Sequence, residues 1–164
     1  MRSELEQREK GKMGPREKGT EGLREKGKRR EDINLKSKIY AMKIRTHKDL
    51  ETYQLAFETS MEIFELTKKF PKEEKYSLTD QIRRSSRSVC ANLAEGFRKR
   101  KYPKSFIAKL SDSEAEGAET QVWLDFSYAC KYIDEDTYLN LFDKYDKILG
   151  KLVNMAIHPE KWTY

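Results

Sequence analysis

Apolar residues recur at intervals of three and four along residues 46–157, a spacing typical of amphipathic helices. The pattern predicts four helices, over residues 48–69, 78–96, 103–131 and 135–156. Because the connections between them are short, neighbouring helices should run antiparallel. The sequence therefore predicts an all-α fold, an up-and-down antiparallel four-helix bundle, with residues 158–164 as a short C-terminal tail.

The periodicity also predicts which face of each helix is buried. The first helix should bury Leu50, Tyr53, Phe57, Met61 and Phe64. The second should bury Leu78, Ile82, Ser85, Val89, Leu93 and Phe97. The third carries a broad stripe made of Ile107, Leu110, Ala118, Gln121, Trp123, Leu124 and Tyr128. The fourth should bury Tyr138, Leu141, Phe142, Tyr145, Ile148, Leu149, Leu152 and Ala156.

Residues typical of helix termini support these bounds. Thr46 and Asp49 have the spacing of a capping box, and Ser77 precedes the second helix as an N-cap. Pro103 suits the first turn of the third helix, where a missing N–H costs nothing. Gly96 reads as the C-cap of the second helix.

The N-terminal segment has a different composition. Residues 1–32 contain few apolar side chains, and the tetrapeptide Arg-Glu-Lys-Gly occurs three times, at residues 8–11, 16–19 and 24–27. Such a stretch cannot bury enough apolar surface to offset the entropy of ordering it. It predicts a disordered basic tail over residues 1–45. The alternative is that translation starts at Met42, immediately before the periodic region.

Two further features bear on location and redox state. The sequence contains neither a run of about 18 apolar residues, which a membrane span needs, nor a secretory signal, so we expect a cytoplasmic protein without membrane association. Cys90 and Cys130 lack the paired spacing of metal sites and lie in apolar helical contexts. Both are expected to be buried thiols.

Basic and acidic residues are concentrated in different parts of the folded region. The chain has a net charge of +6, but residues 83–109 alone hold 9 Lys and Arg against one Asp or Glu. Residues 110–164 hold 5 basic and 11 acidic residues. A basic surface and an acidic surface are therefore expected on the same bundle.

The sequence offers little material for catalysis. His47 and His158 lie at opposite ends of the periodic region and belong to no metal-binding or catalytic motif. The acidic cluster lacks the Glu-x-x-His spacing of di-iron bundles; its members are Asp112, Glu114, Glu116 and Glu119. We therefore expect a protein that is not an enzyme and that has no metal or other cofactor.

The basic residues are the better candidates for a site, because Lys and Arg neutralise phosphates and release counterions. One cluster is expected to bind nucleic acid and consists of Arg98, Lys99, Arg100, Lys101 and Lys104. Tyr102 and Phe97 are candidates for base stacking, although Phe97 also suits the core. Arg83, Arg84 and Arg87 either bind nucleic acid or pair with acidic helix faces, within one subunit or across a subunit interface.

Two segments resemble a known family. Residues 76–86, Tyr-Ser-Leu-Thr-Asp-Gln-Ile-Arg-Arg-Ser-Ser, and residues 91–97, Ala-Asn-Leu-Ala-Glu-Gly-Phe, are similar to the hallmark of the 23S ribosomal RNA intervening-sequence proteins. The resemblance extends over residues 47–157. It implies a four-helix bundle that assembles into a homopentameric ring. It also implies kinship with the accessory variability determinant of diversity-generating retroelements, which binds nucleic acid and a reverse transcriptase.

These observations converge on one expected function and one alternative. The first is a non-catalytic, homo-oligomeric bundle that binds RNA or DNA through a basic rim, as an accessory factor to a nucleic-acid-processing partner such as a reverse transcriptase. The alternative is a protein-protein interaction scaffold that does not bind nucleic acid, whose basic residues form a solvated surface.

Overall fold

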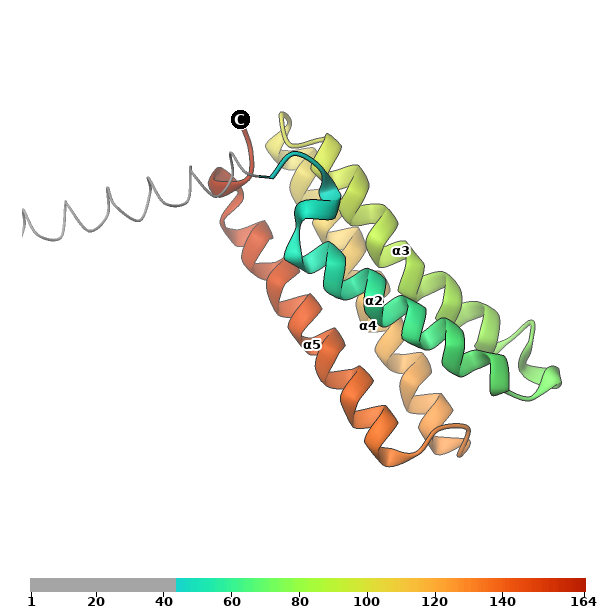
Figure 1. Ribbon diagram of the computed structural model, residues 1–164. Helices are drawn as coiled ribbons and strands as arrows, with labels where there is room; N and C mark the ends of the chain where they lie inside the picture. The colour runs from blue at the N-terminus through green and yellow to red at the C-terminus, as the bar shows by residue number, and fades with distance from the viewer. Residues whose placement is uncertain (1–43) are drawn as a thin grey trace, which may run out of the picture. The chain divides into compact units, whose positions relative to one another are not determined.

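The computed structural model describes residues 44–164, which form a bundle of four helices (Figure 1). The helices are α2 (Glu51–Leu66), α3 (Leu78–Arg98), α4 (Pro103–Ala129) and α5 (Glu135–Ile157). Short 3-10 turns flank them and are η1 (His47–Asp49), η2 (Thr67–Lys69), η3 (Lys72–Glu74) and η4 (Pro159–Lys161). Each helix packs against the next, and α5 returns to α2. The predicted all-α four-helix bundle is confirmed.

The folded region begins slightly earlier than predicted. Ile44, assigned to the tail from the sequence, is buried in the core. The predicted capping box is present, because the Asp49 carboxylate accepts hydrogen bonds from the N–H groups of Arg45 and Thr46, each at 2.8 Å. It caps η1, however, and α2 starts only after Leu50, whose backbone is extended. The rest of the predicted tail, with its repeat and Met42, lies outside the described residues.

Helices α3 and α5 bury the faces that their periodicity predicts. On α3, all six predicted residues are buried, from Leu78 to Phe97. On α5, four of the eight predicted residues are buried, namely Leu141, Tyr145, Ile148 and Leu152. The other four predicted residues are half-buried, and Met155, which was not predicted, is buried with the core. Two helix starts are as predicted, since Pro103 opens α4 and α5 begins at Glu135. The structure adds an N-cap to α5, because the Asp134 carboxylate accepts the N–H of Thr137 at 2.8 Å.

Helix α2 turns a different face to the core. The residues it buries are mostly small, namely Thr52, Ala56, Thr59, Ser60 and Ile63. Phe57 and Met61, predicted to be buried, are 49% and 40% exposed, so this part of the prediction is wrong. The helix carries apolar side chains on more than one face, and periodicity alone could not select between them.

Helix α4, like α2, buries mainly small residues and leaves several larger apolar residues exposed. Its buried face is rich in small and polar residues and consists of Phe106, Leu110, Ser113, Gly117, Thr120, Leu124 and Ser127. Ala118 and Tyr128, predicted to be buried, are exposed. Small side chains allow close approach to α3, where Ser113 donates to the carbonyl of Val89 at 2.8 Å.

Gly96 does not end helix α3, as the sequence suggested. The helix continues to Arg98, and Gly96 is buried against α4. A Cβ atom at this position would lie 3.3 Å from the Cβ of Lys109 and 3.7 Å from the ring of Phe106. The glycine therefore permits close helix packing rather than a change of chain direction.

The two cysteines have different environments. Cys90 is buried, as predicted, and burial raises the pKa of its thiol to about 11. Cys130 is exposed, which contradicts the prediction, because α4 ends at Ala129 and this residue lies just beyond its last turn. The two thiols therefore differ in their access to solvent.

Candidate nucleic-acid interface

The basic run predicted to bind nucleic acid forms the tight connection between α3 and α4. The loop is closed by backbone hydrogen bonds from Tyr102 to Lys99 at 2.8 Å and from Phe106 to Tyr102 at 2.9 Å. Four of its five predicted side chains are exposed, namely Arg98, Lys99, Lys101 and Lys104. Within residues 44–164, none of these four forms an ion pair. We call these four residues the basic rim.

Arg100, the fifth predicted residue, has a different environment. Its guanidinium carbon lies 3.6 Å from the centroid of the Phe97 ring and 5.3 Å from that of Tyr164. Its Nε donates to the carbonyl of Phe97 at 2.9 Å. Burial lowers the pKa of Arg100. The structure thus uses Arg100 to hold the loop against the bundle.

The two candidates for base stacking, Tyr102 and Phe97, differ in exposure. Tyr102 is 57% exposed at the centre of the rim, with the Lys101 ammonium 4.9 Å from its ring centroid. Phe97 is only 4% exposed and belongs to the core beneath Arg100. Of the two aromatic rings, Tyr102 is the one available to a ligand.

Glu95, the only acidic residue near the rim in sequence, is already engaged. Its carboxylate pairs with Lys109 at 2.9 Å, and Asp112 pairs with the same ammonium at 3.2 Å. Hydrogen bonds to Glu95 and Asp112 raise the pKa of Lys109. These carboxylates neutralise Lys109, so within residues 44–164 they do not pair with the basic rim.

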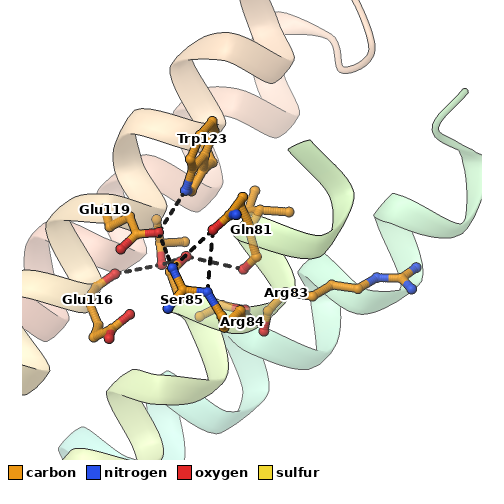
Figure 2. Close-up of polar contacts among 10 residues, drawn as sticks. Gln81, Arg83, Arg84, Ser85, Glu116, Glu119 and Trp123 are labelled. Carbon is orange, nitrogen blue, oxygen red and sulfur yellow. Dashed lines mark hydrogen bonds and ion pairs between the residues drawn. The ribbon is translucent and has the colours of Figure 1, made fainter. Parts of the chain in front are cut away.

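Arg84 belongs to a network within the subunit (Figure 2). Its guanidinium reaches from α3 to the carboxylate of Glu119 on α4 at 2.9 Å and also contacts the amide oxygen of Gln81 at 3.0 Å. The Trp123 indole donates to the same Glu119 oxygen at 3.1 Å. One of the alternatives for Arg84, pairing inside one subunit, is therefore the observed arrangement.

The buried side of the same seam is polar. The Thr120 hydroxyl lies 2.9 Å from that of Ser85 and donates to the carbonyl of Glu116 at 2.8 Å. One carboxylate oxygen of Glu116 is buried without a hydrogen bond in the described part of the chain. Burial, followed by the charge of Glu119, raises the pKa of Glu116.

Arg83 points away from this network in Figure 2 and lies on the other side of α3, against α2. Its Nε donates to the Thr67 hydroxyl at 2.7 Å. The guanidinium carbons of Arg83 and Arg87 lie 4.9 and 5.4 Å from the centroid of the Phe64 ring, and the Lys68 ammonium lies 4.7 Å from it. We call Phe64 and these three cations the basic platform.

The platform carries excess positive charge. Lys68 pairs with Glu65 at 2.7 Å, whereas neither Arg83 nor Arg87 has a carboxylate partner within residues 44–164. Several cations around one ring repel each other, although each is attracted to the ring face. The three arginines of α3 therefore have different roles. Arg84 forms an ion pair with Glu119, whereas Arg83 and Arg87 are available to an anionic partner.

The described residues were also searched for metal sites and for membrane-spanning helices. There, no group of three or more His, Cys, Asp and Glu side chains is arranged to hold a metal ion. Across the same residues, no helix is long and apolar enough to cross a membrane.

Sequence reasoning missed the side chains that α2 exposes toward α5. Phe57 and Met61 were assigned to the core because they share helical spacing with Leu50 and Phe64. A signal for a surface role was present, since Glu58, Glu62 and Glu65 follow the same spacing beside them.

The chain matches known proteins in both sequence and fold. Residues 48–154 match the model of the family described as 23S rRNA-intervening sequence protein. Among solved structures, the chain is similar to a protein with unknown function from the S23 ribosomal protein family of Bacteroides thetaiotaomicron VPI-5482. The identity is 25% and the TM-score 0.58, over 65% of this chain and 95% of that one. The comparison with curated proteins finds no match.

Proposed function

The chain belongs to the 23S rRNA-intervening sequence protein family, and we propose that this member is a non-catalytic helical bundle that binds RNA or DNA through the basic rim. We further propose that it assembles with copies of itself and serves a nucleic-acid-processing partner as an accessory factor. The observation that carries the proposal is the concentration of four exposed cations in and beside the α3–α4 loop, none of which forms an ion pair within residues 44–164.

The chemistry of the rim suits a phosphate backbone. Four exposed cations that have no carboxylate to displace can each neutralise a phosphate and release counterions. Tyr102, exposed among them, offers a ring on which an unpaired base can stack. Such a site reads charge and stacking rather than sequence, so we expect single strands and unpaired loops to be preferred.

Charge reversal of the rim should abolish most binding. We expect the full chain to bind fluorescein-labelled RNA or DNA with an affinity that falls steeply as salt rises, by about 0.7 to 0.9 log units per neutralised phosphate for each log unit of salt. A variant with glutamate at Arg98, Lys99, Lys101 and Lys104 should lose both the affinity and most of that slope. Fluorescence anisotropy across a salt series measures both quantities.

A second variant controls for net charge. Glutamate at Lys69, Lys72, Lys75 and Lys147, which are exposed elsewhere on the bundle, changes the total charge equally. It should bind far more tightly than the rim variant. If the two variants bind alike, the rim is not the site. If the wild type does not bind nucleic acid even at low salt, this proposal is wrong. The alternative, a protein-protein interaction scaffold, then replaces it.

The proposed self-assembly is supported by a second surface. The outward side of α4 exposes apolar and small residues at helical spacing, namely Ala115, Ala118, Val122 and Phe126. Val122 and Phe126 are 47% and 52% exposed. Two acidic side chains without ion-pair partners within residues 44–164 flank this stripe, Glu114 and Asp125.

The basic platform on α2 and α3 complements that stripe. It presents the Phe64 ring together with Arg83 and Arg87, whereas the stripe presents apolar side chains beside Glu114 and Asp125. Two unlike surfaces on one subunit form a head-to-tail interface, which closes into a ring when the rotation permits. The family resemblance makes a pentamer the expected ring.

Arg87→Glu should weaken this assembly. The substitution places a negative charge opposite the acidic stripe of the next subunit, where like charges repel. We expect multi-angle light scattering to show the assembled mass for the wild type and a smaller mass for the variant. Arg98→Glu, an equal charge change on the rim, should leave the mass unchanged. An assembled mass that survives Arg87→Glu would contradict the proposed interface.

A further inference from the structure

A groove runs between α2 and α5, separate from the rim and the platform. Of the four neighbouring helix pairs, α2 and α5 make the sparsest contact. Figure 1 shows the two helices diverging toward the C-terminal end of α2. The groove between them has a volume of about 920 Å³. This is the upper end of the size range of ligand pockets, roughly 300 to 1,000 Å³, and holds several side chains.

The lining of the groove is apolar. Phe57 and Met61, one helical turn apart on α2, line it together with Leu66 and with Leu141 of α5. Phe57 is 49% and Met61 40% exposed, although Ala56, Ser60 and other small residues of the same helix are buried. Large apolar side chains left in solvent beside a hollow are typical of a surface that a partner covers.

The edges of the groove are acidic. Glu58, Glu62 and Glu65 of α2 and Asp136 of α5 line it, against Lys69 as its one basic lining residue. Lys144 pairs with Glu62, and Lys68 pairs with Glu65, both at 2.7 Å. Glu58 and Asp136 have no such partner within the described part of the chain.

We infer that this groove binds a basic amphipathic helix of a partner protein. Helix-in-groove recognition places apolar side chains at intervals of three and four on the groove floor. Lysine or arginine residues flanking that apolar face would then meet Glu58 and Asp136, the two uncompensated carboxylates. The inference does not rest on nucleic-acid binding, because the groove shares no residue with the basic rim.

The charge of the groove argues against the other occupants. An acidic groove repels nucleic acid. A second copy is a poor match at the surfaces described above: its apolar stripe on α4 is flanked by Glu114 and Asp125, which would meet like charges. Its basic rim exposes only one large apolar side chain, Tyr102, and its basic platform has one ring that three cations already cover.

A designed peptide tests the inference directly. The probe is a fluorescein-labelled helical peptide with leucines spaced three and four residues apart and lysines beside them. Its twin has glutamate in place of every lysine. We expect the full chain to bind the basic peptide, seen as a rise in anisotropy, and to ignore the acidic twin. The double variant Glu58→Lys and Asp136→Lys should weaken binding by at least about tenfold, since both ion pairs become repulsive.

Further variants distinguish binding in the groove from nonspecific attraction of the basic peptide to acidic residues elsewhere on the protein. Met61→Asp removes apolar contact without burying a charge and should also weaken binding about tenfold. Glu73→Lys with Glu160→Lys, an equal charge change at exposed sites outside the groove, should alter binding less than about twofold. Absence of peptide binding, or equal loss in the groove and control variants, would overturn the inference. So would an assembled mass that falls with Met61→Asp, since a second copy would then occupy the groove.

Discussion

Phe106→Ala should lower the free energy of unfolding by about 3–5 kcal/mol, because the substitution removes a buried ring and leaves a cavity. Phe106 is 1% exposed and lies in the first turn of α4, directly beneath the loop that carries the basic rim. Its ring packs against Gly96 of α3, a residue that has no side chain to fill the space left by the ring. Since domains are stable by only about 5–15 kcal/mol, the loss is a large share of the total.

Urea denaturation followed by circular dichroism measures this change, at one protein concentration because the proposed assembly would also stabilise the folded state. Tyr76→Ala is the matched control, since this aromatic ring is 82% exposed and its removal should cost less than about 0.5 kcal/mol. If the two variants lose equal stability, the packing of α4 against α3 is not as described. The rim loop should lose order along with Phe106, so weaker nucleic-acid binding is expected in that variant.

Gly117→Val should destabilise the bundle by about 1–3 kcal/mol through overpacking. A Cβ at Gly117 would lie 2.7 Å from the Cδ2 atom of Leu149 and 3.9 Å from the ring of Tyr145. Valine adds two methyl groups beyond that atom, and its stiff χ1 limits escape. The steric cost should exceed the few tenths of a kcal/mol that a helix gains when glycine is replaced by valine.

Gly150 provides the control for helix propensity. It lies in α5, and a Cβ there would meet no atom within 4 Å, so Gly150→Val should be neutral or slightly stabilising. Adding Leu149→Ala to Gly117→Val makes room for the valine, and the double variant should lose less than the sum of the single losses. Simple additivity would show that Leu149 is not the residue that valine meets.

Family membership and much of the fold follow from residues that are close together in the sequence. Pro103 and Asp134 mark helix starts because their effects depend only on the adjacent turn. On α3 the large apolar residues occur on one face, and on α5 most of them do, so the periodicity predicts the main buried side of both helices. Helix α5 also exposes Leu139, Val153 and Ile157. The same local information located the basic run in the α3–α4 loop.

Local sequence patterns are sufficient to predict four helices, their order, the main core faces of α3 and α5, and the exposed cations of the loop. The packing of the helices against one another sets which faces α2 and α4 bury, pairs Arg84 with Glu119, and leaves Phe57 and Met61 beside an acidic groove. Periodicity records where apolar side chains lie around one helix, whereas burial at a helix crossing depends on the volume that the neighbouring helix leaves. Small residues such as Gly117 let the helices approach, and the larger apolar residues then remain outside.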